Sequence, residues 1–185
     1  ANEVLDAMPV RRFCVLADGI AEQYVTATAD GLALQPGTPQ DDRLAARVAG
    51  LDLPAGYVSE VNLTAEAWLR SVCERLDTAL LLLIDYGYPR AEYYHPQRVS
   101  GTLRAHYRQQ AHDDVLRWPG LQDITAHVDF TAMAEAASAA GGHIVGFSSQ
   151  AQFLIDCGLP QLLEATDPAS ADYLDLALQA RQLLL

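Results

Sequence analysis

Carboxylates stand beside amide and aromatic side chains in two short stretches of the sequence. Ionised carboxylates accept hydrogen bonds, bind cations and can grip a guanidinium group through two parallel hydrogen bonds. An amide and a phenol add further donors and acceptors. These stretches are therefore the first candidates for a binding or catalytic site. The first, ANEVLDAMPV, contains Asn2, Glu3 and Asp6, and the second, DYGY, contains Asp85, Tyr86 and Gly87.

A third polar stretch, GLQDITAHVDF, ends at Phe130 and contains His127 and Asp129. These two residues are two positions apart, so a regular strand would place both side chains on one face. Asp129 also precedes an apolar stretch at 130–140, where its side chain can cap a helix. The sequence leaves open whether Asp129 is a cap or a functional acid. Tyr94, in the aromatic stretch after DYGY, is a further candidate for contact with a substrate.

Histidines and acids also occur together between residues 95 and 127. Imidazole and carboxylate groups are good ligands for divalent metals. None of these pairs has the three- or four-residue helical spacing of a metal motif, so we predict no metal site. A hydrolytic pair of carboxylates is possible by residue type, but nothing in the sequence sets a separation. The residues concerned are His95, His106, His112, Asp113 and Asp114.

Elements of an α/β sheet would position the candidate residues. The run ALLLLI at 79–84 is apolar without alternation, which is typical of a central strand covered on both faces. Ligands of open α/β sheets lie at the carboxyl ends of strands, and Asp85 comes directly after this run. The first stretch, at 2–6, would in the same way follow a strand lying upstream of residue 1.

The remaining pattern predicts an α/β fold with an insertion. We expect a short helix at 4–8, a strand at 57–61, a helix from its cap at Asn62 to about residue 77, a helix at 130–140 and a strand at 143–147. The pairs Asp18-Gly19 and Asp30-Gly31 predict hairpins within an insertion at about 10–56, with a short helix at 41–49. Residues 85–128 have little periodicity and form a long functional loop region. Helices are expected at 150–157, 160–165 and 168–185.

Charge excludes some partners. The 185 residues contain 24 acids and 12 basic residues, for a formal net charge of -12. Such a surface repels nucleic acid and anionic lipid and attracts cationic groups. The apolar run at 79–84 is much too short to span a membrane. Three cysteines without a paired spacing indicate reduced thiols.

Four strings resemble the signature blocks of the MidA-like family of S-adenosylmethionine-dependent methyltransferases, found in bacteria and mitochondria. They are NEVLDAMPV (2–10), LIDYGYPRAEYYHPQR (83–98), GTLRAHYR (101–108) and PGLQDITAHVDFT (119–131). The resemblance implies a Rossmann-like sheet and S-adenosylmethionine as cofactor. The mitochondrial member methylates an arginine of a respiratory complex I subunit, so a protein substrate of this kind is the implied partner. The bacterial cytoplasm or the mitochondrial matrix is the implied location.

The family's glycine-rich cofactor loop lies upstream of the NEVLDA block. The resemblance therefore implies that residues 1–185 are a partial methyltransferase domain, the later half of the fold with its acceptor side, and that this chain alone is inactive. Two alternatives stay open, a non-catalytic binding or assembly module and a metal-dependent hydrolase. On the methyltransferase hypothesis the catalytic candidates are Glu3, Asp6, Asp85 and Tyr86, and the substrate-binding candidates are Asn2, Gly87, Tyr94, His127 and Asp129.

Overall fold

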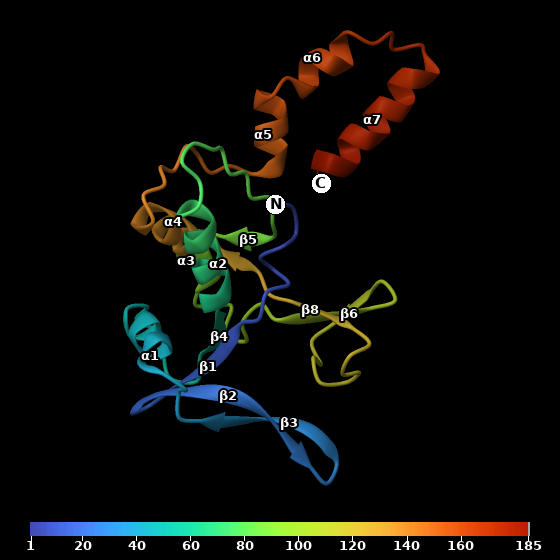
Figure 1. Ribbon diagram of the computed structural model, residues 1–185. Coiled ribbons are helices and arrows are strands. Elements are labelled where there is room, and N and C mark those ends of the chain that lie inside the picture. Colours follow the sequence, from blue (N-terminus) through green and yellow to red (C-terminus); the bar gives the residue numbers. More distant parts are fainter. Residues whose placement is uncertain (185) are drawn as a thin grey trace. The chain divides into compact units, whose positions relative to one another are not determined.

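A four-stranded antiparallel sheet occupies the first third of the chain in the computed structural model, which describes residues 1–184 (Figure 1). The turns at Asp18-Gly19 and Asp30-Gly31 connect its strands as predicted, and both glycines have positive φ, 153° and 127°. The strand order is β3-β2-β1-β4. The strands are β1 (Arg11–Leu16), β2 (Gly19–Thr28), β3 (Gly31–Gly37) and β4 (Val58–Val61).

Two helices follow strands of this sheet. Helix α1 (Asp42–Ala49) is capped by Asp41, whose side chain accepts the Arg43 N–H, and α2 (Leu63–Cys73) begins directly after β4. Asn62 caps α2 by accepting the Ala65 N–H at 2.8 Å, as predicted. Helix α2 ends four residues before the expected position. A hydrophobic core that includes Phe13, Leu44 and Tyr57 packs between the sheet and α1.

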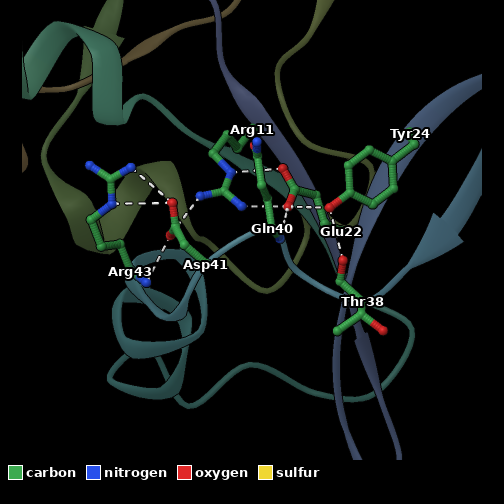
Figure 2. A network of polar contacts seen from close by, with 7 residues as sticks. All are labelled: Arg11, Glu22, Tyr24, Thr38, Gln40, Asp41 and Arg43. Atoms are coloured by element: carbon green, nitrogen blue, oxygen red, sulfur yellow. Dashed lines mark hydrogen bonds and ion pairs between the residues drawn. The ribbon is translucent and has the colours of Figure 1, made fainter.

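A partly buried ion-pair network ties β1, β2 and the start of α1 together (Figure 2). Arg11 donates to Glu22 at 2.7 Å through Nε and to Asp41 at 2.9 Å through Nη1. Glu22 also accepts the Tyr24 hydroxyl at 2.8 Å and the Gln40 N–H at 2.9 Å. The hydrogen bonds from Arg11 are the main reason that the pKa of Glu22 falls to about 2. The ionised carboxylate is thus part of the fold.

We expect Glu22→Gln to lower the free energy of unfolding by about 3 kcal/mol, because Arg11 loses a buried partner. The folded pKa of Glu22 lies below its ordinary value of 4.5, so the ionised pair stabilises the fold above pH 4.5. This contribution is lost as the pH falls from 4.5 towards 2. Urea unfolding at pH 7 and pH 3 measures the effect. Glu74→Gln, on an exposed residue, is the matched control. A Glu22→Gln effect that does not shrink at pH 3 would contradict the assignment.

The region at 85–128, expected to be mainly loop, contains several short elements, the last of which ends at Asp129. β5 pairs in parallel with β9, and β7-β6-β8 form a small antiparallel sheet. Helix α4 (Phe130–Ala139) packs against α2, and Leu5, Leu69 and Met133 belong to the core between them. The short elements are β5 (Gly87–Tyr88), α3 (Arg90–Tyr93), β6 (Arg104–Tyr107), β7 (Gln110–His112), β8 (Asp123–Thr125) and β9 (Val128–Asp129).

The buried strand predicted at 79–84 is not formed among the described residues. Among the described residues only residues 1–3 run beside it, through a single parallel bridge between Asn2 and Ile84. Leu80 is 81% exposed, whereas a central strand needs a neighbour on each side and cover on both faces. The short helix expected at 4–8 is instead a turn.

The strand expected at 143–147 is also not formed, and Val145 is 86% exposed. The chain divides into two compact units, Ala1–His143 and a second that begins at Ile144. The second unit contains the three helices expected there, with slightly different ends. They are α5 (Gln150–Asp156), α6 (Leu159–Glu164) and α7 (Ala171–Leu184). No helix among residues 1–184 is long and apolar enough to cross a membrane.

Candidate functional site

The two carboxylate stretches predicted from sequence meet around the side chain of Asp85. Its Oδ2 atom accepts the backbone N–H groups of Val4 at 3.1 Å, Leu5 at 2.9 Å and Asp6 at 3.4 Å. Its Oδ1 atom accepts the N–H of Tyr86 at 2.9 Å. Four backbone donors thus converge on this one side chain. Asp85 therefore shapes the loop at 2–6, and its oxygens are already engaged by backbone.

A second side chain holds the same loop from the other side. Asn62 donates through Nδ2 to the carbonyl oxygen of Leu5 at 3.0 Å, while its Oδ1 caps α2. Leu5 is 1% exposed and packs in the core between α2 and α4. The loop is thus fixed by hydrogen bonds and by one buried apolar side chain.

The loop gathers negative charge at one edge. Asp6 is 8% exposed, and its Oδ1 atom is buried without a hydrogen-bond partner among the described residues. Burial, and then repulsion by Asp85, raises the pKa of Asp6. The nearby charge of Glu3 and a hydrogen bond to it raise the pKa of the exposed Tyr86 hydroxyl. Glu3 is held at a positive φ of 49°, which is uncommon outside glycine. This edge can bind a cationic group.

Strands β5 and β9 bring the third predicted stretch beside the same edge. Gly87 pairs with Val128, and the Val128 N–H donates to the Tyr86 carbonyl oxygen at 2.8 Å. A Cβ atom at Gly87 would lie 2.2 Å from the Val128 carbonyl oxygen, so only glycine fits. His127 packs against Tyr88, with ring centroids 5.1 Å apart. Burial is the main cause of its lowered pKa, which keeps the imidazole neutral at pH 7.

Asp129 is a helix cap, the structural alternative left open by the sequence. Its Oδ1 accepts the Ala132 N–H at 3.1 Å, and its Oδ2 lies 3.3 Å from Arg90 Nε. Tyr94 lies elsewhere, in the core beside the four-stranded sheet. Its hydroxyl donates to the Glu60 carbonyl oxygen at 3.0 Å. The structure therefore brings together the predicted residues of the first two stretches, places His127 and Asp129 next to them, and leaves Tyr94 in the core.

One buried carboxylate escaped the sequence analysis. Glu60 is 0% exposed and accepts the Thr102 N–H at 2.8 Å, and burial raises its pKa. The Thr102 hydroxyl oxygen in turn accepts the backbone N–H of His127 at 3.0 Å. Glu60 thus anchors the segment that carries His127. The sequence pattern that indicates a buried acid here is the strand VSEV, in which Glu60 stands among apolar or small residues.

The histidines and acids considered as metal ligands do not converge. Within residues 1–184, no group of three or more histidine, cysteine, aspartate or glutamate side chains is arranged to hold a metal ion. The imidazole of His106 lies 3.3 Å from the Thr125 hydroxyl, and His112 packs on Trp118. The three cysteines are free, and Cys157 is exposed.

Residues 1–148 match the protein family described as "Putative S-adenosyl-L-methionine-dependent methyltransferase". The match covers well over half of the chain, which therefore belongs to this family. This chain has a mixed α/β structure with short sheets and helices.

Relatives and solved structures extend the comparison. The chain is 29% identical over 184 residues to the mitochondrial protein arginine methyltransferase NDUFAF7 of Rattus norvegicus, covering 91% of this chain and 38% of that protein. It is 29% identical over 134 residues to the Caenorhabditis elegans homolog, covering 70% and 30%.

Two crystal structures of Burkholderia thailandensis proteins have TM-scores of 0.93 and 0.92 and are 44% identical to the chain. The second is bound to S-adenosyl-homocysteine. Each match covers 99% of this chain but only 50% and 48% of the solved chains. The chain thus spans about half the length of these solved relatives and about a third of the length of the two curated ones.

We expect Asp129→Asn to keep the cap of α4 and Asp129→Ala to lose it, because an asparagine oxygen can also accept the first-turn N–H. The alanine variant should therefore be about 1 kcal/mol less stable than the asparagine variant. Thermal unfolding of both proteins measures the difference. Equal stability of the two variants would contradict the capping role. A loss of activity in a fully stable asparagine variant would instead point to a functional charge.

Proposed function

We propose that this chain forms the acceptor side of an S-adenosylmethionine-dependent methyltransferase that modifies an arginine of a protein substrate. The single observation that carries this proposal is the loop at 2–6, folded onto Asp85 so that Glu3, Asp6 and Tyr86 face one edge. Membership of the methyltransferase family supports the reaction class. The arginine acceptor is supported by the names of the two mitochondrial relatives.

The negative edge suits a guanidinium acceptor. A carboxylate can hold this planar group through two hydrogen bonds and orient one nitrogen for attack. The unpartnered Oδ1 atom of Asp6 fits a cationic group placed here. When bound, S-adenosylmethionine supplies an electrophilic methyl group, and the protein's contribution is mostly positioning.

Asp6 and Glu3 have separable roles in this proposal. The guanidinium nitrogen loses a proton when it is methylated, and a base with a raised pKa accepts that proton more readily than an ordinary carboxylate. Asp6 has such a raised pKa. Glu3, exposed and linked to Tyr86, holds the outer side of the guanidinium group. Asp85 acts by fixing the loop. Gly87, on β5, and the neutral His127, directly before β9, lie beside it.

We further propose that the complete fold is a Rossmann-like sheet, of which this chain is the later half. The insertion at about 10–56 and the functional region at about 85–128 would belong to this partial domain, and the main cofactor loop would lie upstream. Two observations support this. The chain spans about half of the solved relatives, and the leucines at 80–82 are exposed although their sequence is that of a buried strand. Residues 79–84 and 143–147 would then be strands of the completed sheet.

The charge of the chain is consistent with a cationic protein substrate, such as an arginine-bearing subunit of a respiratory complex. The relatives are mitochondrial, so a mitochondrial location would apply in a eukaryote and a cytoplasmic one in a bacterium.

A binding or assembly module without chemistry is the second candidate, favoured by the same acidic edge. Binding of S-adenosylmethionine by the complete protein separates the two.

In the complete protein, we expect Glu3→Gln and Asp6→Asn to depress methyl transfer and leave cofactor binding unchanged. Stability should not fall, because the acids at this edge repel one another and burial already disfavours a charge on Asp6. Single-turnover assays with an arginine peptide and thermal unfolding measure both properties. Asp175→Asn, on an exposed acid of α7, is the matched control. Normal transfer by both variants would contradict the role of these acids.

We expect the 185-residue chain alone to bind S-adenosylmethionine weakly or not at all and to be inactive, whereas a chain of the length of the solved relatives binds it. The reason is that the loop proposed to hold the cofactor lies upstream. Calorimetric titration of both proteins tests this expectation. Micromolar binding by the 185-residue chain would overturn it, and no binding by the longer protein would favour the assembly module.

A further inference from the structure

Thr102 connects two buried segments of the first unit. The residue is 8% exposed, and its backbone N–H donates to Oε2 of Glu60, on β4, at 2.8 Å. Its hydroxyl oxygen accepts the backbone N–H of His127 at 3.0 Å and lies 3.4 Å from the same Glu60 oxygen. One small side chain therefore joins β4 to the segment that leads into β9.

The Glu60 end of this connection is closely packed. Glu60 is 0% exposed, and its carbonyl oxygen accepts the Tyr94 hydroxyl at 3.0 Å. A Cβ atom at Gly101 would lie 2.3 Å from Oε1 of Glu60, and Gly101 has a positive φ of 77°. Only glycine lets the backbone turn and approach the carboxylate this closely. The position of Thr102, the next residue, is thereby fixed relative to β4.

The other end of the connection reaches both stretches of the candidate site. The N–H of Ala126, directly before His127, donates to the carbonyl oxygen of Asp6 at 2.9 Å. The N–H of Val128, directly after it, donates to the carbonyl oxygen of Tyr86 at 2.8 Å. This three-residue segment is thus held at its middle residue, and its two outer residues hold the two site stretches.

We propose that Thr102 and Glu60 are positioning residues for the methyl transfer proposed above, on which this role rests. They act through the segment at 126–128, which sets where Asp6 and Tyr86 lie. Because both residues are buried, they act on the placement of the site and not on the substrate itself. Placement matters in such a reaction, since a misplacement of about 1 Å can cost on the order of a hundredfold in rate.

Thr102→Val in a protein of the length of the solved relatives tests the proposal, with Thr102→Ser as its conservative partner. Valine has the shape of threonine without the hydroxyl, so the His127 N–H loses its acceptor, whereas serine keeps one. Hydrogen exchange followed by NMR is the first readout. We expect the N–H of Leu5, whose acceptor is Asp85, to exchange roughly fivefold faster in the valine variant, because the loop loses part of its support. The serine variant should exchange at nearly the original rate.

Methyl transfer to an arginine peptide is the second readout. We expect Thr102→Val to lower kcat by roughly tenfold and to leave the KM for S-adenosylmethionine nearly unchanged, because only the acceptor side is displaced. Thr102→Ser should recover most of this loss. Tyr57→Phe is the matched control, since it removes another buried hydroxyl, which donates to the His95 carbonyl oxygen at 3.0 Å. Thermal unfolding of each variant measures the accompanying loss of stability.

Equal effects of Thr102→Val and Tyr57→Phe on exchange at Leu5 and on kcat would overturn the proposal, because general loosening of the fold would then explain both. Unchanged exchange at Leu5 in a folded valine variant would also overturn it. If Thr102→Val does not fold, Glu60→Gln gives the same comparison, since it replaces the charged acceptor of the Thr102 N–H with a neutral amide. Failure of the unsubstituted complete protein to transfer methyl groups would contradict the proposed function, whereas exchange at Leu5 would still decide whether Thr102 positions the loop.

Discussion

The candidate site depends on one carboxylate, that of Asp85. Three successive backbone N–H groups of the loop, those of residues 4–6, converge on its Oδ2 atom. Buried or half-buried N–H groups without an acceptor destabilise a fold by an amount comparable to a lost hydrogen bond. Without this carboxylate the three N–H groups would lose their acceptor, and the loop would not be held in this turn. The positions of Glu3, Asp6 and Tyr86 relative to one another follow from that turn.

Gathering acids in one place is unfavourable, and the surrounding structure compensates for it. Burial, and then the charge of Asp85, raises the pKa of Asp6. Leu5 offsets this by entering the core between α2 and α4, and Asn62 ties the Leu5 carbonyl to the start of α2. A strained, charged loop on a rigid support is the usual arrangement where a protein binds or transforms a ligand.

Elsewhere in the first unit, arginines form ion pairs with acids from other segments. Arg11, Arg47 and Arg90 each bridge two carboxylates, and each joins segments that are well separated in the sequence. At the Asp85 edge, by contrast, acids lie beside one another, and burial together with the charge of Asp85 raises the pKa of Asp6.

The sequence by itself determined the features that depend on neighbours within a few residues. The hairpin turns at Gly19 and Gly31 and the cap at Asn62 form as predicted, and Asp129 forms the cap that was one of the two roles left open. Each uses a backbone torsion or a hydrogen bond two or three residues away. The family also followed from short strings of residues. Only the tertiary structure decided the rest. The strand at 79–84 is not formed because pairing needs neighbours that local sequence does not specify. The anchoring role of Asp85 spans about eighty residues, and the buried acceptor at Glu60 spans 42, so no local pattern could reveal either contact.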